Sequence, residues 1–412
     1  MKQIAFLLLS FTLLYQQSNG QRIRKDKIID HVSFLASDAL LGRATSSEDE
    51  GKAAAYIADA FKRMDIAPKG NRGYFHYFTY KKSNQNDPHG TTESSTGVTM
   101  KSKNVVGFID NGAPYTVVIG AHYDHLGLGH DHNSLDANPE GKIHNGADDN
   151  ASGVAGLLEL ARYFRSNGIK EKNNFLFIAF SGEELGLLGS KKWCEYPSYP
   201  LKKINYMINL DMIGRLNDKT KKLLVYGVGT SDVWIPTLEK INTFFTFKYD
   251  SSGVGPSDHT SFYLKDIPVL HYFTGQHSDY HKPTDDLDKV NAQGEVYVLE
   301  HIIDLIYALD TESKLHFYKT KSVDTKMSFK VTLGIMPDYA YDGKGVHLDG
   351  VTENKPAHRA GLEKGDVILK LGSFETLTMQ DYMKALGQFE KGETTTVEYL
   401  RDNAIHYASV TF

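Results

Sequence analysis

Short apolar runs alternate with longer amphipathic runs through the first three quarters of the chain. Helical spacing of apolar residues marks two runs within residues 26–64, and then residues 154–161, 183–193, 233–245 and 292–309. Apolar runs of strand length occupy residues 104–109, 115–119, 174–180, 204–210, 223–228 and 268–271. Strands that alternate with helices predict an α/β sandwich whose central strands are buried on both faces.

The pattern changes near residue 311. Residues 311–326 are rich in Lys, Ser and Thr and contain few large apolar residues, which is typical of a linker. Beyond it, strand patterns at residues 330–336, 345–351, 367–371, 394–401 and 406–412 surround one helical run at residues 378–387. A chain of 412 residues therefore holds one large α/β domain and a small β-rich domain.

The charge of the chain limits the kinds of partner that it can bind. The formal net charge is −5 and the isoelectric point is about 6.4, with Lys and acidic residues interspersed along the chain. A nucleic-acid-binding protein usually carries a basic patch or stripe. We therefore do not expect a nucleic acid as the partner.

The first twenty residues predict a signal peptide. Lys2 precedes an apolar stretch at residues 4–14, and Ser18 and Gly20 supply the small residues of a cleavage site. An uncleaved anchor is the alternative, but this stretch is shorter than the ~20 residues that span a bilayer, and no later stretch is long enough. We expect export to the periplasm or the medium. Because Cys194 is the only cysteine, the core or a metal must replace internal disulfides.

Candidate metal ligands follow the predicted strands, where α/β sheets place their sites. A His at a strand end or an Asp pair in a turn is ordinary by itself, but carboxylates gathered in neighbouring loops need cations to offset their repulsion. Two His with several Asp and Glu form the ligand set of a two-zinc hydrolase. The candidates are His122, Asp124, Asp148, Asp149, Glu183, Glu184, Asp211 and His281.

The sequence runs that contain these candidate ligands together resemble those of the co-catalytic zinc aminopeptidases related to bacterial leucyl aminopeptidase and glutamate carboxypeptidase. The resemblance covers residues 26–309 and implies a three-layer α/β/α domain with a mostly parallel mixed central sheet. The runs that carry it are AHYDHLG at 121–127, NGADDNASG at 145–153, SGEELGLLGS at 181–190, NLDMIG at 209–214, SDH at 257–259 and YH at 280–281.

The resemblance implies two zinc ions bridged by Asp148. His122 and Asp211 would complete one zinc site, and Glu184 and His281 the other. Glu183 would be the general base that takes a proton from the attacking water, and Asp124 the partner that orients His122. Tyr280 would either donate a hydrogen bond to the oxyanion or serve only as a packing residue. Asp149 would support Asp148 from behind, across a cis peptide bond between the two aspartates. Asp258 and His259 would support the pocket, and His125, His130 and His132 are expected to be solvated loop residues.

Residues 328–412 resemble a bacterial PDZ domain. Residues 333–335 look like its carboxylate-binding loop, and residues 356–362 and 364–368 follow the bacterial form. Such domains bind the C-terminal end of a peptide as an added strand. The alternative is a domain that only packs against the catalytic one.

We therefore expect an exported zinc aminopeptidase that acts on peptides with a free N-terminus. Its domains would be a signal peptide at 1–20, a catalytic domain at 21–320 and a PDZ domain at 328–412. Two alternatives are open. One is a glutaminyl cyclase, which has the same fold with a single zinc, and the other is a catalytically inactive peptide receptor.

Overall fold

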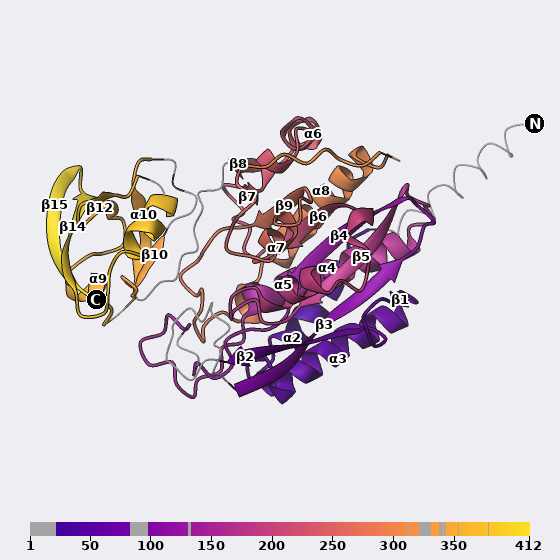
Figure 1. Cartoon of the computed structure of the whole chain (residues 1–412), viewed down its shortest axis with the longest axis horizontal. Coiled ribbons are helices and arrows are strands. Elements are labelled where there is room, and N and C mark those ends of the chain that lie inside the picture. Colours follow the sequence, from indigo (N-terminus) through magenta and orange to yellow (C-terminus); the bar gives the residue numbers. More distant parts are fainter. Residues whose placement is uncertain are drawn as a thin grey trace, which may run out of the picture.

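The fold is described from a computed structural model. The structure describes residues 22–82, 98–130, 133–311, 313–320, 331–337, 341, 343–352, 354–377 and 379–412. The predicted signal peptide, His132 and residues 321–326 of the predicted linker lie outside these residues. Figure 1 shows a larger part built from helices around a central sheet and a smaller, strand-rich part that contains the C-terminus.

A nine-stranded mixed sheet runs through the larger part, with the order β1-β3-β5-β4-β6-β9-β7-β8 and with β2 paired to β3. The four central strands β5, β4, β6 and β9 are parallel, whereas β3 and β7 join the sheet antiparallel to β5 and β9. The strands are β1 (Ala67–Pro68), β2 (Phe75–Lys82), β3 (Val98–Ile109), β4 (Tyr115–His122), β5 (Asn173–Phe180), β6 (Ile204–Leu210), β7 (Lys222–Tyr226), β8 (Thr246–Asp250) and β9 (Val269–Phe273).

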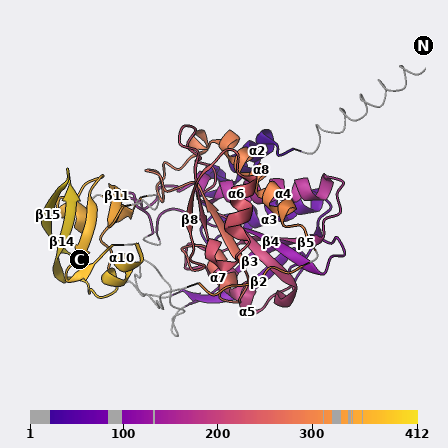
Figure 2. The ribbon, with the colours of Figure 1, turned by 90° about the horizontal axis from the view of Figure 1, so that it is seen from above.

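Helices cover both faces of this sheet, which confirms the predicted three-layer α/β/α class (Figure 2). One face carries α2 (Lys25–Leu35), α3 (Glu48–Arg63), α4 (Gly153–Ser166), α6 (Trp234–Ile241) and α8 (Ala292–Ala308). The other face carries α5 (Leu188–Glu195) and α7 (His259–Tyr263). Single 3₁₀ turns lie at η1 (Asp38–Leu40), η3 (Leu201–Lys203), η4 (Val228–Thr230) and η5 (Leu287–Lys289).

Strand β5 shows why the central strands read as continuous apolar runs. All of its residues are buried, because successive side chains point to opposite faces and both faces are covered. Phe175 and Phe177 lie in the core beneath α4, whereas Leu176 and Ile178 lie in the core beneath α5 and α7.

Two predicted helices are shorter than expected. The helix predicted at residues 183–193 begins only at Leu188, because Gly182, Gly186 and Leu187 all have positive φ angles and hold residues 182–187 in an irregular turn. The helix predicted at residues 233–245 ends at Ile241, and the edge strand β8 begins at Thr246 after a short irregular connection.

The C-terminal part has its own sheet, in the order β10-β11-β12-β14-β15 with β13 paired to β12. Its separate core includes Leu333, Leu348, Ile368 and Val397. The elements are β10 (Ile335–Pro337), β11 (Val346–Val351), α9 (Pro356–Arg359), β12 (Val367–Leu371), β13 (Phe374–Glu375), α10 (Met379–Leu386), β14 (Thr394–Arg401) and β15 (Ala404–Thr411).

Among the described residues, every helix falls short of the length and apolar character that a bilayer crossing requires.

Candidate metal centre

The candidate ligands meet at the carboxyl edge of the central sheet. His122 is the last residue of β4, Asp211 directly follows β6, and Glu183 and Glu184 follow β5 after a two-residue turn. His281 lies in the loop that leaves β9. Parallel strands bring their carboxyl ends to one edge, so residues 159 positions apart in the chain line a single cavity.

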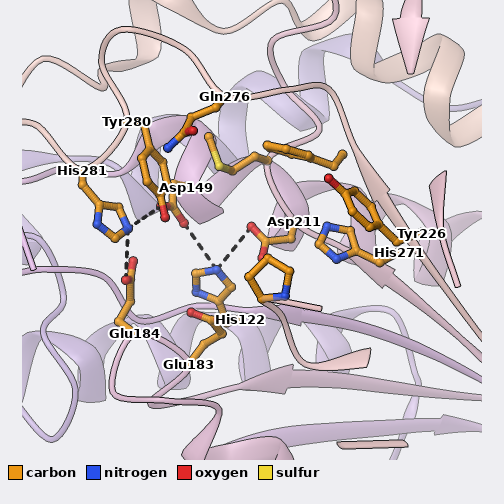
Figure 3. A pocket seen from close by; sticks show the side chains of 13 residues that line it. His122, Asp149, Glu183, Glu184, Asp211, Tyr226, His271, Gln276, Tyr280 and His281 are labelled. Atoms are coloured by element: carbon orange, nitrogen blue, oxygen red, sulfur yellow. Dashed lines mark ion pairs between the residues drawn. The ribbon is translucent and has the colours of Figure 1, made fainter. Parts of the chain in front are cut away.

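Asp149 lies at the centre of this cluster (Figure 3). Its Oδ1 lies 3.3 Å from Nε2 of His122, and its Oδ2 lies 3.2 Å from Nε2 of His281. His122 Nε2 is also 3.5 Å from Asp211 Oδ1, and His281 Nε2 is 3.2 Å from Glu184 Oε2. The two oxygens of one carboxylate therefore face two separate pairs, each made of a histidine and an acid.

The prediction that Asp148 occupies this central place is wrong by one residue. Asp148 points away from the cavity, where its Oδ1 accepts hydrogen bonds from the Gly214 amide at 2.7 Å and the Ser152 hydroxyl at 3.0 Å. Its Oδ2 lies 3.2 Å from Nε2 of His277. Asp148 is thus the residue that supports the turn from behind, and Asp149 is the residue that faces the histidines.

The backbone of residues 146–150 explains this arrangement. Asp149 and Asn150 have non-helical dihedral angles, and the cis peptide bond joins Asp149 to Asn150 rather than Asp148 to Asp149 as the resemblance implied. Gly146 has a positive φ of 55°, and a Cβ there would lie 2.1 Å from the Asp149 carbonyl oxygen. Only glycine fits this close approach, so the small residues ahead of the aspartates allow the turn that presents Asp149.

Neighbouring groups orient the ligands. Asp285 Oδ2 accepts hydrogen bonds from the amides of Asp148 and Asp149 at 3.0 and 3.1 Å. Nδ1 of His281 lies 2.8 Å from the Asn133 carbonyl oxygen, which leaves Nε2 to face Asp149. The Ser257 hydroxyl donates to Asp211 Oδ2 at 2.6 Å, which leaves Oδ1 of Asp211 on the side of His122.

Asp124 lies beside His122, as the sequence predicted, but its closest approach is through the main chain. Nδ1 of His122 is 3.2 Å from the Asp124 carbonyl oxygen and 3.8 Å from its Oδ1. Oδ1 of Asp124 instead accepts a hydrogen bond from the Glu183 amide at 3.2 Å. Asp124 therefore connects the end of β4 to the turn that carries Glu183.

The expectation that His125 is a solvated loop residue is wrong. His125 is 2% exposed, and its Nδ1 lies 2.7 Å from Oε1 of Glu184. Its imidazole therefore holds the Glu184 oxygen that does not face His281. His130 is exposed, in agreement with the prediction.

Burial and neighbouring charges together set the pKa values of the cluster. Burial raises the pKa of Glu183 well above its usual value, and Asp211 and Glu184 add to this effect against the opposing influence of His122. Burial also acts against an ionised Asp149, but His122 and His281 outweigh it and hold the pKa of Asp149 well below its usual value. The pKa of His281 is raised well above normal because Glu184 and Asp149 outweigh its burial.

These residues fit divalent cations. Buried carboxylates need a positive partner, and within the described residues the ion-pair partners of Asp149, Glu184 and Asp211 are imidazoles. One ligand atom each of His122, Asp149 and Glu184 lies within 4.8 Å of the others. Imidazole nitrogen and carboxylate oxygen are the donors that zinc takes in catalytic sites.

The cluster opens into a cavity of about 80 Å³. Glu183 lies on one side of it, and Tyr280 and Gln276 lie on the other (Figure 3). The ring of Tyr280 stacks on His281, with the ring centroids 3.9 Å apart. The rest of the wall is largely apolar and aromatic, and includes Met212, Tyr226, Pro256, His271 and Phe273.

Asp258 and His259 are buried below this wall. Nδ1 of His259 lies 3.1 Å from Nδ1 of His271, and burial lowers the pKa of His271 to about 4. Burial raises the pKa of Asp258 to about 7. Both predicted supporting residues therefore lie behind the cavity, and His271 is the member of this group that lines it.

Sequence reasoning missed several contributors to the site. Asp285 and His277 lie in the loops after β9, and Arg43 precedes α3. Arg43 and Asp285 contact main-chain atoms of the turn that carries Asp149, and His277 contacts the side chain of Asp148 in the same turn. The sequence gives no local signal for them, because a lone Asp, His or Arg in a loop is common.

Two parts of the chain match known families. Residues 104–306 match peptidase family M28, and residues 322–412 match the PDZ domain. This chain carries a family M28 peptidase domain. The family match contains all the candidate ligands, from His122 to His281, and confirms the resemblance to zinc aminopeptidases seen in the sequence.

Curated relatives match part of this chain. Aminopeptidase YwaD of Bacillus subtilis is 30% identical over 234 residues, which are 53% of this chain and 46% of that protein. A probable leucine aminopeptidase of Arthroderma otae is 32% identical over 197 residues, which are 45% of this chain and 50% of the relative. The chain thus spans about half the length of these two relatives.

Solved structures share the fold of the peptidase domain. A zinc aminopeptidase of Bacillus subtilis, BSAP, superposes with a TM-score of 0.52 at 18% identity and covers 72% of this chain and 98% of that chain. A glutaminyl cyclase of Bacteroides thetaiotaomicron superposes equally well, with a TM-score of 0.53 at 18% identity over 70% of this chain and 99% of that chain. The fold alone therefore does not separate the two activities.

Proposed function

We propose that this M28 chain is an aminopeptidase that uses two zinc ions to remove N-terminal residues from peptides. The observation that carries the proposal is the position of Asp149, whose two carboxylate oxygens face His122 and His281 on opposite sides. A carboxylate shared in this way suits a bridge between two cations.

Asp149 replaces Asp148 in the proposed ligand set. His122, Asp149 and Asp211 would hold one zinc, and Asp149, Glu184 and His281 would hold the other. Two bound zinc ions would lower the pKa of the attacking water and polarise the peptide carbonyl.

Glu183 is the proposed general base. It lines the cavity beside His122, and its amide is held by the Asp124 carboxylate. In the proposed scheme each zinc has its own histidine and acid besides Asp149, so Glu183 is not needed as a ligand. Its carboxylate can therefore accept a proton from the attacking water and return it to the leaving amine. Tyr280 lines the same cavity from the other side and is proposed to donate a hydrogen bond to the oxyanion.

The substrates are proposed to be peptides with a free N-terminus, whose first side chain enters the apolar and aromatic part of the cavity. The PDZ domain is proposed to bind a second, extended peptide segment by its C-terminal carboxylate, near residues 333–335. Binding of labelled peptides with a free or an amidated C-terminus tests this part, because amidation should abolish binding at a carboxylate loop.

Export to the periplasm or the medium is also part of the proposal. It rests on the pattern of residues 1–20. Fractionation of the producing cells, with sequencing of the mature N-terminus, tests it: recovery of the intact chain from the cytoplasm would contradict it.

Zinc content and substrate turnover of the purified chain test the proposed function. We expect two zinc ions per chain and release of the chromophore from aminoacyl anilides. One zinc ion with cyclisation of N-terminal glutamine would instead identify a glutaminyl cyclase. Peptide binding without turnover of either substrate would identify an inactive receptor.

A further inference from the structure

A segment before residue 104, and so outside the family match, contacts the metal centre at several points. We call residues 43–50 the N-terminal brace. They begin shortly after η1 and run into the first turn of α3, whose N-cap Ser47 accepts a hydrogen bond from the Glu50 amide at 2.9 Å. Side chains of the brace contact the end of β4, the turn before Asp149 and the turn before Glu183.

Arg43 makes the most extensive of these contacts. Its side chain is fully buried, and among the described residues its acceptors are all main-chain carbonyl oxygens. Nε donates to Tyr123 at 2.8 Å, and Nη2 donates to Gly146 at 2.7 Å. Nη1 donates to Leu35 at 3.0 Å and to Asn145. One planar guanidinium thus links the strand end that carries His122 to the turn that carries Asp149.

A charge buried in this way needs compensation. The carboxylates of Asp149, Asp124 and Asp285 favour the charged form of Arg43, although burial lowers its pKa to about 10. The arginine is therefore charged at neutral pH and offsets part of the negative charge of the metal centre. Lys has one point charge in place of five fixed N–H donors, so it cannot reproduce this set of contacts.

Two other brace residues act on the side of the general base. The Thr45 hydroxyl donates to Asp124 Oδ2 at 2.7 Å, and the other Asp124 oxygen accepts from the Glu183 amide. Glu50 is fully buried and accepts hydrogen bonds from the hydroxyls of Ser102, at 2.9 Å, and Ser181. Ser181 lies two residues before Glu183.

We infer that Arg43 is a positioning residue that sets the Asp149 turn against the end of β4 before a cation binds. Thr45 acts in the same way on Asp124 and, through it, on Glu183. This inference rests on the proposed two-cation centre. Its consequence is that the brace raises zinc affinity without touching the metal or the substrate, because aligned ligands need less ordering when the cation arrives.

Zinc affinity of Arg43→Lys and Arg43→Met, measured by competition with a chromogenic chelator, tests the inference. We expect both variants to bind zinc about 10- to 100-fold more weakly, the loss typical of removing a group that orients a ligand. Hydrogen exchange of residues 145–149 in the zinc-free protein should become faster. Arg165→Met is the matched control, because Arg165 also donates to a main-chain carbonyl, that of Asp65, but at the surface.

The outcomes separate the inference from the proposed function. If the wild-type chain binds no zinc, the proposed function fails. If the wild type binds two zinc ions and folded Arg43→Lys binds them equally well, the role of Arg43 is structural only and the inference is overturned.

A second pair of variants keeps the test decisive if the Arg43 variants do not fold. Thr45→Val removes the hydroxyl that holds Asp124 and keeps the shape of the side chain, whereas Thr45→Ser keeps the hydroxyl. We expect Thr45→Val to lower kcat about 10-fold or more with little change in KM, and to alter the visible spectrum of the cobalt-substituted protein. Thr45→Ser should restore both. Equal values for the two variants would overturn the inference.

Discussion

Buried carboxylates have different ion-pair partners in the two domains. In the PDZ domain, Asp366 is 1% exposed and Arg401 donates to both of its oxygens at 2.7 Å. In the peptidase domain, the ion pairs of Asp149, Glu184 and Asp211 within the described residues involve only imidazoles. The first carboxylate is neutralised by the chain itself, and the others form a set that a cation from solution can complete.

This difference separates a carboxylate that stabilises a fold from one that supports a reaction. A guanidinium is a permanent partner, so Asp366 has no oxygen left over for a ligand. Imidazoles are themselves metal ligands, so the histidines around Asp149 need not compete with a cation and can bind it together with the acid.

The largest effect on zinc affinity and activity should follow from removing the charge of the Asp149 carboxylate. Asp149→Asn should lower zinc affinity by more than about 100-fold, beyond the loss caused by removing an orienting group, and should abolish peptidase activity. Zinc content and anilide hydrolysis measure both effects. Asp148→Asn is the matched neighbour and should stay within about 10- to 100-fold of the wild type. A larger loss in Asp148→Asn would restore Asp148 as the bridge.

Glu183→Gln should separate proton transfer from cation binding. The variant keeps the size of the side chain but cannot accept the proton of water, so kcat should fall roughly 10²- to 10⁴-fold. Zinc content should be unchanged, since Glu183 is outside the proposed ligand set. Glu195→Gln, at the exposed end of α5, is the control. Normal turnover by Glu183→Gln would rule out this base.

Removal of zinc by a chelator should destabilise one domain only. Ligand present at about 1,000 times its Kd stabilises a fold by about 4 kcal/mol, which corresponds to a Tm change of roughly 8–16 °C in a domain of this size. Calorimetry of the zinc-bound and chelated chains should show this decrease for the peptidase transition. The PDZ transition should not move. A shift of both transitions by the same amount would show that the domains unfold together.

The smallest effect on activity should come from Arg401→Met. The variant leaves Asp366 buried without its cation and should cost the PDZ domain about 1.5–3 kcal/mol, the loss typical of hydrogen bonds to a charged group. Zinc content and hydrolysis of small anilides should equal those of the wild type. Urea unfolding followed separately for each domain measures the change.

The sequence predicted most of the fold because the fold rests on periodicity. Predicted spans at residues 204–210, 367–371 and 394–401 coincide with β6, β12 and β14, since apolar runs bounded by polar residues are local signals. Strand β8 was missed because its residues are only partly buried at the edge of the sheet, which leaves no apolar run to detect.

The sequence predicted which segments form the site, but not which side chains within them face the cavity. Which of two adjacent aspartates faces the cavity depends on the dihedral angles of Asp149 and Asn150, and the letters of the run do not specify these. The role of His125 depends on a contact with Glu184, 59 positions further along the chain. Arg43 lies 102 positions before its partner Asn145, so no local pattern reveals the pair.

The spread of the metal ligands along the chain also bears on how the enzyme matures. The brace at residues 43–50 and the strand end at His122 are synthesised first, whereas His281 follows 159 residues after His122. A growing chain therefore lacks the histidine that faces the second oxygen of Asp149 until most of the peptidase domain has been made. The two proposed metal positions could be completed only late in synthesis, and a partly synthesised chain would not yet contain all the proposed ligands.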